Sequence, residues 1–303
     1  MLRRYITQIR YILSQIILPR LSGVGYFFAM LGTVAVVTSH AQPVRLIVRG
    51  DDMGFTHAAN EACIETFRQG IVRSVEVMVP TPWFPEAVKM LREQPDLDVG
   101  IHLTLTSEWE NVKWKPLTRA PSLTDSMGYF YPTIWPNDNF GEDQALQGHS
   151  WQLAEVEQEL RAQIELAKRT IPQLSHLTGH MGCHQLDERV EALVKKLAVA
   201  YKLDIFPEEL GVLRVRYVGP KKTQEEKISS FLAMLEGLTP GTYLFVDHPA
   251  YDNAEVQAVY HLGYTDVAND RQGVTTLLTD PSVKEAIRRL GIQLVSYHDI
   301  AKP

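Results

Sequence analysis

The sequence predicts a single α/β domain, built from parallel strands that alternate with helices. Apolar runs of strand length alternate along the chain with segments whose apolar residues recur at helical spacing, a pattern typical of parallel βαβ units. The chain has 303 residues, of which 45% are hydrophobic, which is enough for one sizeable core. We find no internal repeat and no low-complexity tract in the sequence.

The predicted strands are six apolar runs, at residues 45–50, 73–79, 98–105, 174–180, 242–248 and 292–297. The third run shows the cleanest alternation, with one face apolar from Val99 to Leu105 and the other face carrying His102. The apolar face can pack beneath helices. His102 is therefore expected to point to the opposite face, into the mouth of the fold.

Helical periodicity fills the intervals, at residues 57–69, 84–94, 151–171, 187–200, 223–236 and 281–290. Thr56 is placed to cap the first of these helices and Gly70 to end it. Pro85 falls in the first turn of the second helix, and Pro95 follows its end. The interval 151–171 is the clearest helix, because its apolar residues recur three and four positions apart and form one stripe.

Residues 106–150 break this alternation. They carry aromatic side chains among proline, asparagine, aspartate and glycine, and the aromatic content argues against disorder. Two interpretations stay open. The aromatic side chains stack on the faces of a bound sugar, with Trp109 as a candidate contact, or the loop is a flap that packs over the top of the fold.

The first 41 residues differ from the rest in composition. They contain arginines but no acidic residue, and residues 24–37 form a mostly apolar stretch. Ser39-His40-Ala41 follows, with small residues at the two positions that signal peptidase recognises. We expect a signal peptide at 1–41 and an exported mature chain, periplasmic or secreted, at 42–303. The alternative is an uncleaved membrane anchor, although the apolar stretch is short for a span of about 20 residues.

Removal of that segment makes the chain more acidic. The full chain has 30 Lys+Arg and 36 Asp+Glu, a net charge of −6, and the four arginines of residues 1–41 would leave 26 against 36, a net charge of −10. Nucleic-acid binding needs basic surface, so no nucleic-acid partner is expected. A homodimer is left open.

The chain has two cysteines, and a secreted protein of this size does not need a disulfide to fold. Cys63 lies among apolar residues of a predicted helix and is expected in the core. Cys183 lies near the candidate site described next, where burial as a small hydrophobic side chain is favoured over metal ligation. Whether the two cysteines pair is left open.

The candidate site begins with Asp51-Asp52, which closes the first apolar run. Two adjacent carboxylates raise each other's pKa, and a cation relieves that cost. His102 and His180 also lie near the ends of predicted strands, and one carboxylate with two imidazoles suits a catalytic divalent metal. The second carboxylate is then free to act as a base.

Two further strand ends carry polar candidates. His184 begins the loop after the strand 174–180 and is a candidate substrate contact. His248 ends the strand 242–248, where it can donate a proton while Asp247 orients a ligand. The alternative for His248 and Asp247 is a satisfied hydrogen bond at the strand end.

These motifs together resemble one family. The chain carries, in this order, Arg49-Gly50-Asp51-Asp52-Met53-Gly54-Phe55, Gly70-Ile71-Val72-Arg73-Ser74, Val99-Gly100-Ile101-His102-Leu103-Thr104-Leu105 and His248-Pro249. The ordered set resembles the YdjC-like carbohydrate deacetylases, also called the ChbG/HpnK deacetylases, from about residue 45 to the C-terminus. The resemblance implies a distorted (β/α) TIM-like barrel and a hydrolase that removes N-acetyl groups from a sugar or oligosaccharide.

Carried over by position, the resemblance implies a role for each candidate. Asp51 becomes the catalytic base, and His248 lies beside the reacting group. One divalent metal ion is held by Asp52, His102 and His180. Zn²⁺ fits these ligands on softness, and the resemblance also admits Mg²⁺. The expected substrate contacts are His184, Trp109 and Arg271.

The chain departs from the family pattern mainly at positions expected to touch the substrate. Arg49 and Gly50 replace the usual Asn-Ala, the second imidazole after His180 is missing, Ala250 replaces a glycine, and the acidic residue usual after Arg271 is absent. Two alternatives therefore stay open: another metal-dependent amide or ester hydrolase on the same scaffold, or a non-catalytic sugar-binding protein.

Overall fold

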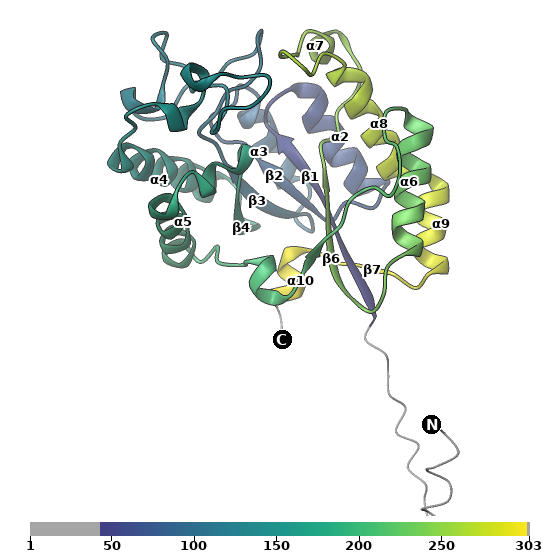
Figure 1. Cartoon of the computed structure of the whole chain (residues 1–303). Helices are drawn as coiled ribbons and strands as arrows, with labels where there is room; N and C mark the ends of the chain where they lie inside the picture. The colour runs from purple at the N-terminus through teal and green to yellow at the C-terminus, as the bar shows by residue number, and fades with distance from the viewer. Residues whose placement is uncertain (1–42, 302–303) are drawn as a thin grey trace, which may run out of the picture. The chain divides into compact units, whose positions relative to one another are not determined.

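The computed structural model describes residues 43–301, and Figure 1 shows their arrangement. The predicted export segment, residues 1–41, lies outside the described residues. Within 43–301, no helix is both long enough and apolar enough to cross a bilayer.

One sheet forms the centre of the described chain. Its strands are β1 (Val44–Met53), β2 (Ser74–Val77), β3 (Asp98–Leu103), β4 (Leu174–Gly179), β5 (Leu213–Arg214), β6 (Gly241–Asp247) and β7 (Gln293–Leu294). Neighbours follow the order β4-β3-β2-β1-β6-β5, and β7 pairs with the beginning of β1. These strands pair only in parallel. The predicted α/β class is therefore confirmed.

Helices connect the strands and lie outside the sheet. They are α2 (His57–Arg68), α3 (Phe84–Arg92), α4 (Leu153–Thr170), α5 (Glu188–Tyr201), α6 (Gln224–Glu236), α7 (Ala254–Gln257), α8 (Val267–Thr279), α9 (Pro281–Arg289) and α10 (Tyr297–Ala301). Short 3₁₀ turns are η1 (Pro121–Leu123), η2 (Glu142–Gln144), η3 (Leu146–Gly148), η4 (His180–Gln185) and η5 (Pro207–Leu210). In Figure 1, α4 and α5 lie beside β3 and β4, and α6, α8 and α9 lie on the side of β6. The sheet path is open between β4 and β5, so the fold is a distorted, incomplete (β/α) barrel.

Local sequence explains several element ends. The Thr56 hydroxyl accepts a hydrogen bond from the N–H of Ala59 at 3.1 Å, so Thr56 caps α2 as predicted. The helix ends at Arg68. Gly70 follows where a Cβ would collide with the carbonyl oxygen of Leu278, and glycine therefore lets the chain pass close to α8.

Several elements differ from the sequence prediction, among them β5 and α7, which were not predicted. Helix α8 was not predicted, because Gly273 and Thr275 have weak helix propensity. In the structure, Asp266 at its N-cap makes no side-chain capping bond. The predicted strand 292–297 is wrong beyond its first residues. Only Gln293–Leu294 forms a strand, and Tyr297 already begins α10.

The aromatic loop and the cysteines are packed into the fold. Trp109, Trp114 and Phe140 are each 3% exposed, and Phe130 is fully buried, which favours the flap interpretation for these side chains. Cys63 and Cys183 are both buried and unpaired.

Candidate metal centre and active site

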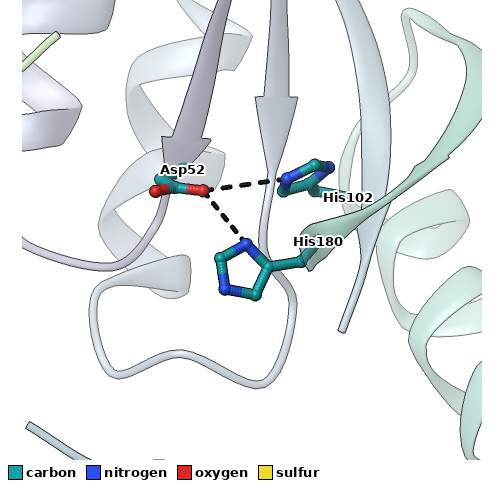
Figure 2. Close-up of side chains that lie close together, drawn as sticks. All are labelled: Asp52, His102 and His180. Atoms are coloured by element: carbon teal, nitrogen blue, oxygen red, sulfur yellow. Dashed lines mark ion pairs between the residues drawn. The ribbon is translucent and has the colours of Figure 1, made fainter. Parts of the chain in front are cut away.

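Three side chains, those of Asp52, His102 and His180, point toward one another, as Figure 2 shows. Asp52 lies near the end of β1, His102 lies in β3, and His180 begins η4 directly after β4. The carboxyl ends of parallel strands form one rim of a (β/α) fold, and functional groups gather on that rim.

A bulge brings both carboxylates of the Asp51-Asp52 pair to this rim. Consecutive residues of a regular strand point to opposite faces. Here the register between β1 and β2 shifts between Gly50 and Met53, and Asp52 adopts a left-handed φ of 67°. Such a conformation costs of the order of 1–3 kcal/mol for a non-glycine residue. As a result, His102 Nε2 lies 3.8 Å from Asp51 Oδ2 and 3.7 Å from Asp52 Oδ1.

The candidate ligand atoms surround one oxygen. Asp52 Oδ1 lies 3.3 Å from His180 Nδ1 and 3.7 Å from His102 Nε2, and the three ligand atoms lie within 4.8 Å of one another. Asp52 Oδ1 is buried and accepts no hydrogen bond. Buried polar atoms are rarely left unpaired. A buried carboxylate oxygen facing two imidazole nitrogens therefore fits a divalent cation, and this donor set suits zinc.

The outer nitrogen of each histidine also has a partner. His102 Nδ1 lies 2.7 Å from Thr178 Oγ1, and His180 Nε2 lies 3.1 Å from Glu108 Oε2. Burial lowers the pKa of His102 to about 4, so this ring is in the neutral form that binds metal. Burial also disfavours charge on His180, but the carboxylates of Glu108 and Asp52 outweigh it and raise its pKa to about 10. The negative surroundings of His180 favour a cation there.

Arg271 joins the site from α8. Its Nη2 lies 2.8 Å from Asp52 Oδ2, and its guanidinium also lies over the rings of Phe55 and Trp109. Burial would raise the pKa of Asp52, but the positive charges of His248 and Arg271 hold it well below its usual range. Arg271 is only 4% exposed. Its predicted contact with substrate stays a prediction.

The predicted base, Asp51, is buried and held by one side chain. Arg49 donates from Nε to Asp51 Oδ1 and from Nη2 to Asp51 Oδ2. Its third donor, Nη1, reaches the hydroxyl of Tyr297. The carboxylate of Asp51 is thereby fixed in orientation beside His102.

His248 lies at the open side of the site. Its Nε2 is 4.0 Å from Asp52 Oδ2, and its Nδ1 is 3.5 Å from Asp247 Oδ1. The other oxygen of Asp247 accepts a hydrogen bond from Tyr217 at 2.6 Å. Partial burial opposes charge on His248, but the carboxylates of Asp52 and Asp247 outweigh it and raise its pKa.

A cavity of 860 Å³ lies beside His248. Its lining includes Arg214, Arg216, Tyr217, Asp247, His248 and Tyr264. The side chain of His248 is 41% exposed, whereas those of the three ligand candidates are at most 5% exposed. His248 thus separates the buried ligand atoms from the open cavity.

Two predicted substrate contacts are packed away from this opening. Trp109 stacks on Phe55 with ring centroids 5.8 Å apart and also contacts His261. His184 lies against Gly179, where a Cβ would collide with its ring, and its buried Nδ1 has no hydrogen-bond partner. Their roles with substrate stay predictions.

The sequence prediction missed three polar residues around the site: Glu76, Glu108 and Thr178. Glu76 is the only acidic residue of the apolar run 73–79, and it is completely buried. That isolated carboxylate was the available signal. Glu108 and Thr178 carried none, because a polar residue in a loop or on a half-polar strand is ordinary.

The absence of a side chain at Gly100 leaves room for the buried carboxylate of Glu76. Glu76 in β2, Gly100 in β3 and His176 in β4 are register partners across the sheet. His176 Nε2 lies 2.6 Å from Glu76 Oε1, so the pair bridges over the middle strand. A Cβ at Gly100 would approach both Glu76 Oε1 and His176 Nε2 to 2.5 Å. Glycine therefore leaves the space that this buried bridge needs.

Sequence comparison relates this chain to known proteins. A family model described as YdjC-like protein matches residues 45–289. A carbohydrate deacetylase of Brevibacillus brevis is 28% identical to this chain, over 85% of this chain and 100% of that protein. A carbohydrate deacetylase of Thermus thermophilus is 32% identical, over 71% of this chain and 80% of that protein.

A solved structure extends the similarity to three dimensions. The crystal structure of an Enterococcus faecalis protein, described as a candidate cellobiose-phosphate cleavage protein, aligns with a TM-score of 0.66 and 26% identity. The alignment covers 85% of this chain and 99% of that chain. The two chains therefore share one fold over nearly the same length.

Proposed function

The chain belongs to the YdjC-like family, and on that premise we propose that it is a metal-dependent hydrolase that removes N-acetyl groups from a sugar or oligosaccharide. The relatives named carbohydrate deacetylases support the reaction. The observation that carries the proposal is the convergence of Asp52, His102 and His180 beside a second carboxylate, Asp51.

The metal would be held by Asp52, His102 and His180. When bound, a divalent ion supplies Lewis acidity, which polarises the acetamide carbonyl and lowers the pKa of a water molecule. Zn²⁺ and Mg²⁺ are the candidates, and the two imidazoles favour Zn²⁺. Asp52 Oδ1 is a buried acceptor without a hydrogen-bond donor, and this supports its assignment as a ligand.

Asp51 acts as the general base. It accepts the proton of the attacking water as the tetrahedral intermediate forms. Both oxygens of Asp51 already accept hydrogen bonds from Arg49, but each carboxylate oxygen can accept more than one. Arg49 thus orients the base without blocking it.

His248 acts as the general acid. It donates a proton to the nitrogen of the amine as that nitrogen leaves, and the products are acetate and a free amino sugar. Its position between the buried ligands and the open cavity suits contact with substrate. Because the pKa of His248 is raised, a larger fraction of its rings is protonated near neutral pH than for a free histidine.

Acetate release tests the proposal. The metal-free protein is supplied with Zn²⁺ or Mg²⁺ and assayed on N-acetylated sugars, on simple esters and on non-sugar amides, with His102→Ala as the inactive control. We expect acetate from N-acetyl sugars only when metal is present. Turnover of esters or other amides alone would point to a different hydrolase, and sugar binding without turnover would point to a non-catalytic protein.

A further inference from the structure

We propose that Glu76, acting through Thr178, is a positioning residue that fixes the ring tautomer of His102 and so sets the affinity of the metal centre. The inference rests on the proposed metal site. It concerns a buried carboxylate that none of the proposed chemical steps uses directly.

The three residues form a short chain of hydrogen bonds across neighbouring strands. The hydroxyl of Thr178 in β4 donates to Glu76 Oε2 in β2 at 2.5 Å. The same hydroxyl oxygen lies 2.7 Å from His102 Nδ1 in β3. Glu76 is completely buried, so water does not compete for its oxygens.

Counting protons decides the tautomer of His102. An ionised carboxylate can only accept, so the one hydroxyl proton of Thr178 points to Glu76. The hydroxyl oxygen must then accept the hydrogen bond from His102, which puts a proton on Nδ1. In a neutral ring, Nε2 then carries no proton and has a free lone pair. Nε2 is the atom that faces Asp52 Oδ1 at 3.7 Å. This is the tautomer that metal ligation through Nε2 requires.

The surroundings keep Glu76 ionised and fixed. Burial would raise the pKa of Glu76, but His176 and Arg49 lower it. His176 Nε2 pairs with Glu76 Oε1 at 2.6 Å, and the His176 ring stacks on Tyr297 with centroids 3.6 Å apart. Arg49 Nε lies 3.9 Å from Glu76 Oε1 and also holds Asp51. One buried carboxylate therefore supports both a metal ligand and the base.

The second histidine of the centre needs the opposite tautomer. His180 faces Asp52 with Nδ1 and directs Nε2 to Glu108. A free imidazole interconverts between its tautomers, so each ring needs its own hydrogen-bond partner. Partners of this kind typically contribute about 10–100-fold to metal affinity.

Calorimetric titration of the metal-free protein with Zn²⁺ tests the inference. Thr178→Val keeps the side-chain shape but removes the hydroxyl, and we expect Zn²⁺ affinity to fall about 10–100-fold. Thr178→Ser keeps the hydroxyl and should retain the affinity. Thr66→Val is the control, because Thr66 is a buried threonine of α2 whose hydroxyl donates to the backbone carbonyl of Cys63 at 3.0 Å. Its Zn²⁺ affinity should equal that of the wild type.

Nitrogen NMR of the metal-free protein gives a second readout that a general packing defect would not produce. The wild-type His102 ring should carry its proton on Nδ1, and Thr178→Val should show a mixture of tautomers. Either wild-type Zn²⁺ affinity or an unchanged tautomer in Thr178→Val would overturn the inference. If Thr178→Val does not fold, Glu76→Gln takes its place in both measurements, with the same two expectations.

The outcomes separate this inference from the proposed function. A wild-type protein that binds Zn²⁺ and releases acetate, with Thr178→Val binding equally well, would remove the inference alone. A clear loss of affinity in Thr178→Val in a protein that releases no acetate would support the inference and contradict the proposed reaction. A wild-type protein that binds no divalent ion would overturn both.

Discussion

Arg49 donates one hydrogen bond to each carboxylate oxygen of Asp51, from Nε at 2.7 Å and from Nη2 at 2.8 Å. Both side chains are buried. Paired hydrogen bonds of this geometry are strong and fix orientation. Arg49 therefore fixes the orientation of the proposed base.

Arg49→Met should destabilise the fold, because it leaves the Asp51 carboxylate buried without its partner. Breaking a buried ion pair on one side costs roughly 3–5 kcal/mol of unfolding free energy. Urea denaturation measures this loss. The double variant Arg49→Met/Asp51→Asn should recover much of it, since no unpaired charge is left. Equal losses in the single and double variants would show that the pairing does not matter.

Gly100→Ala should disturb the buried bridge between Glu76 and His176, because the added Cβ would lie 2.5 Å from an atom of each. We expect a loss of roughly 1–3 kcal/mol in unfolding free energy. Gly237→Ala is the control, since Gly237 has φ of −84° and an added Cβ would meet its nearest atom at 3.5 Å. It should be neutral or stabilising by about 0.4–1 kcal/mol. Similar values for both variants would contradict the packing argument.

The convergence of the three candidate ligands could be predicted, because each lies at or near the end of an apolar run. In parallel sheets such ends meet on one rim, so Asp52, His102 and His180 could be brought together without knowing the exact path of the chain. The bulge that turns Asp52 beside Asp51 could not be predicted, because a change of register depends on the neighbouring strand.

The supporting residues escaped prediction for a related reason. Glu76 and its partner Thr178 are 102 positions apart in the chain, and no local pattern links them. Helix α8, which carries Arg271, has a weak helical sequence and is stabilised by packing against α2 and α6. Tertiary contacts, which sequence periodicity does not report, decide both features.

The stability of the fold should depend on pH through His57. A hydrogen bond from His57 Nδ1 to Glu86 at 2.9 Å is the largest cause that raises the pKa of His57. The stabilisation is therefore fully present below the unfolded pKa of about 6.5 and is lost as pH rises through the higher folded pKa. Because the His57 side chain is 38% exposed, solvent screening keeps the effect at or below about 1 kcal/mol.

Glu86→Gln should accordingly lower the unfolding free energy more at pH 5.5 than at pH 9 in urea denaturation. Glu157→Gln is the control, because its partner Arg161 stays charged at both values of pH. Its effect should be the same at both. An equal penalty for Glu86→Gln at pH 5.5 and pH 9 would exclude the assigned role of His57.

Export is a separate prediction that concerns residues outside the described part of the chain. The arginine-rich leader, the apolar stretch and Ser39-His40-Ala41 lead us to expect cleavage after Ala41. N-terminal sequencing of protein from its native host should then read from Gln42. An intact Met1 on a soluble cytoplasmic product would refute export.

The central claim is that two neighbouring carboxylates have different roles, Asp52 as a metal ligand and Asp51 as the base. It is tested most directly by measuring acetate release from N-acetylated sugars across a metal titration for Asp51→Asn and Asp52→Asn. Asp51→Asn should bind metal as the wild type does, yet lose about 10²–10⁴-fold in rate, because general-base assistance is gone. Asp52→Asn should bind metal weakly and regain part of its activity when excess metal is added. Near wild-type activity in metal-loaded Asp51→Asn would contradict the account.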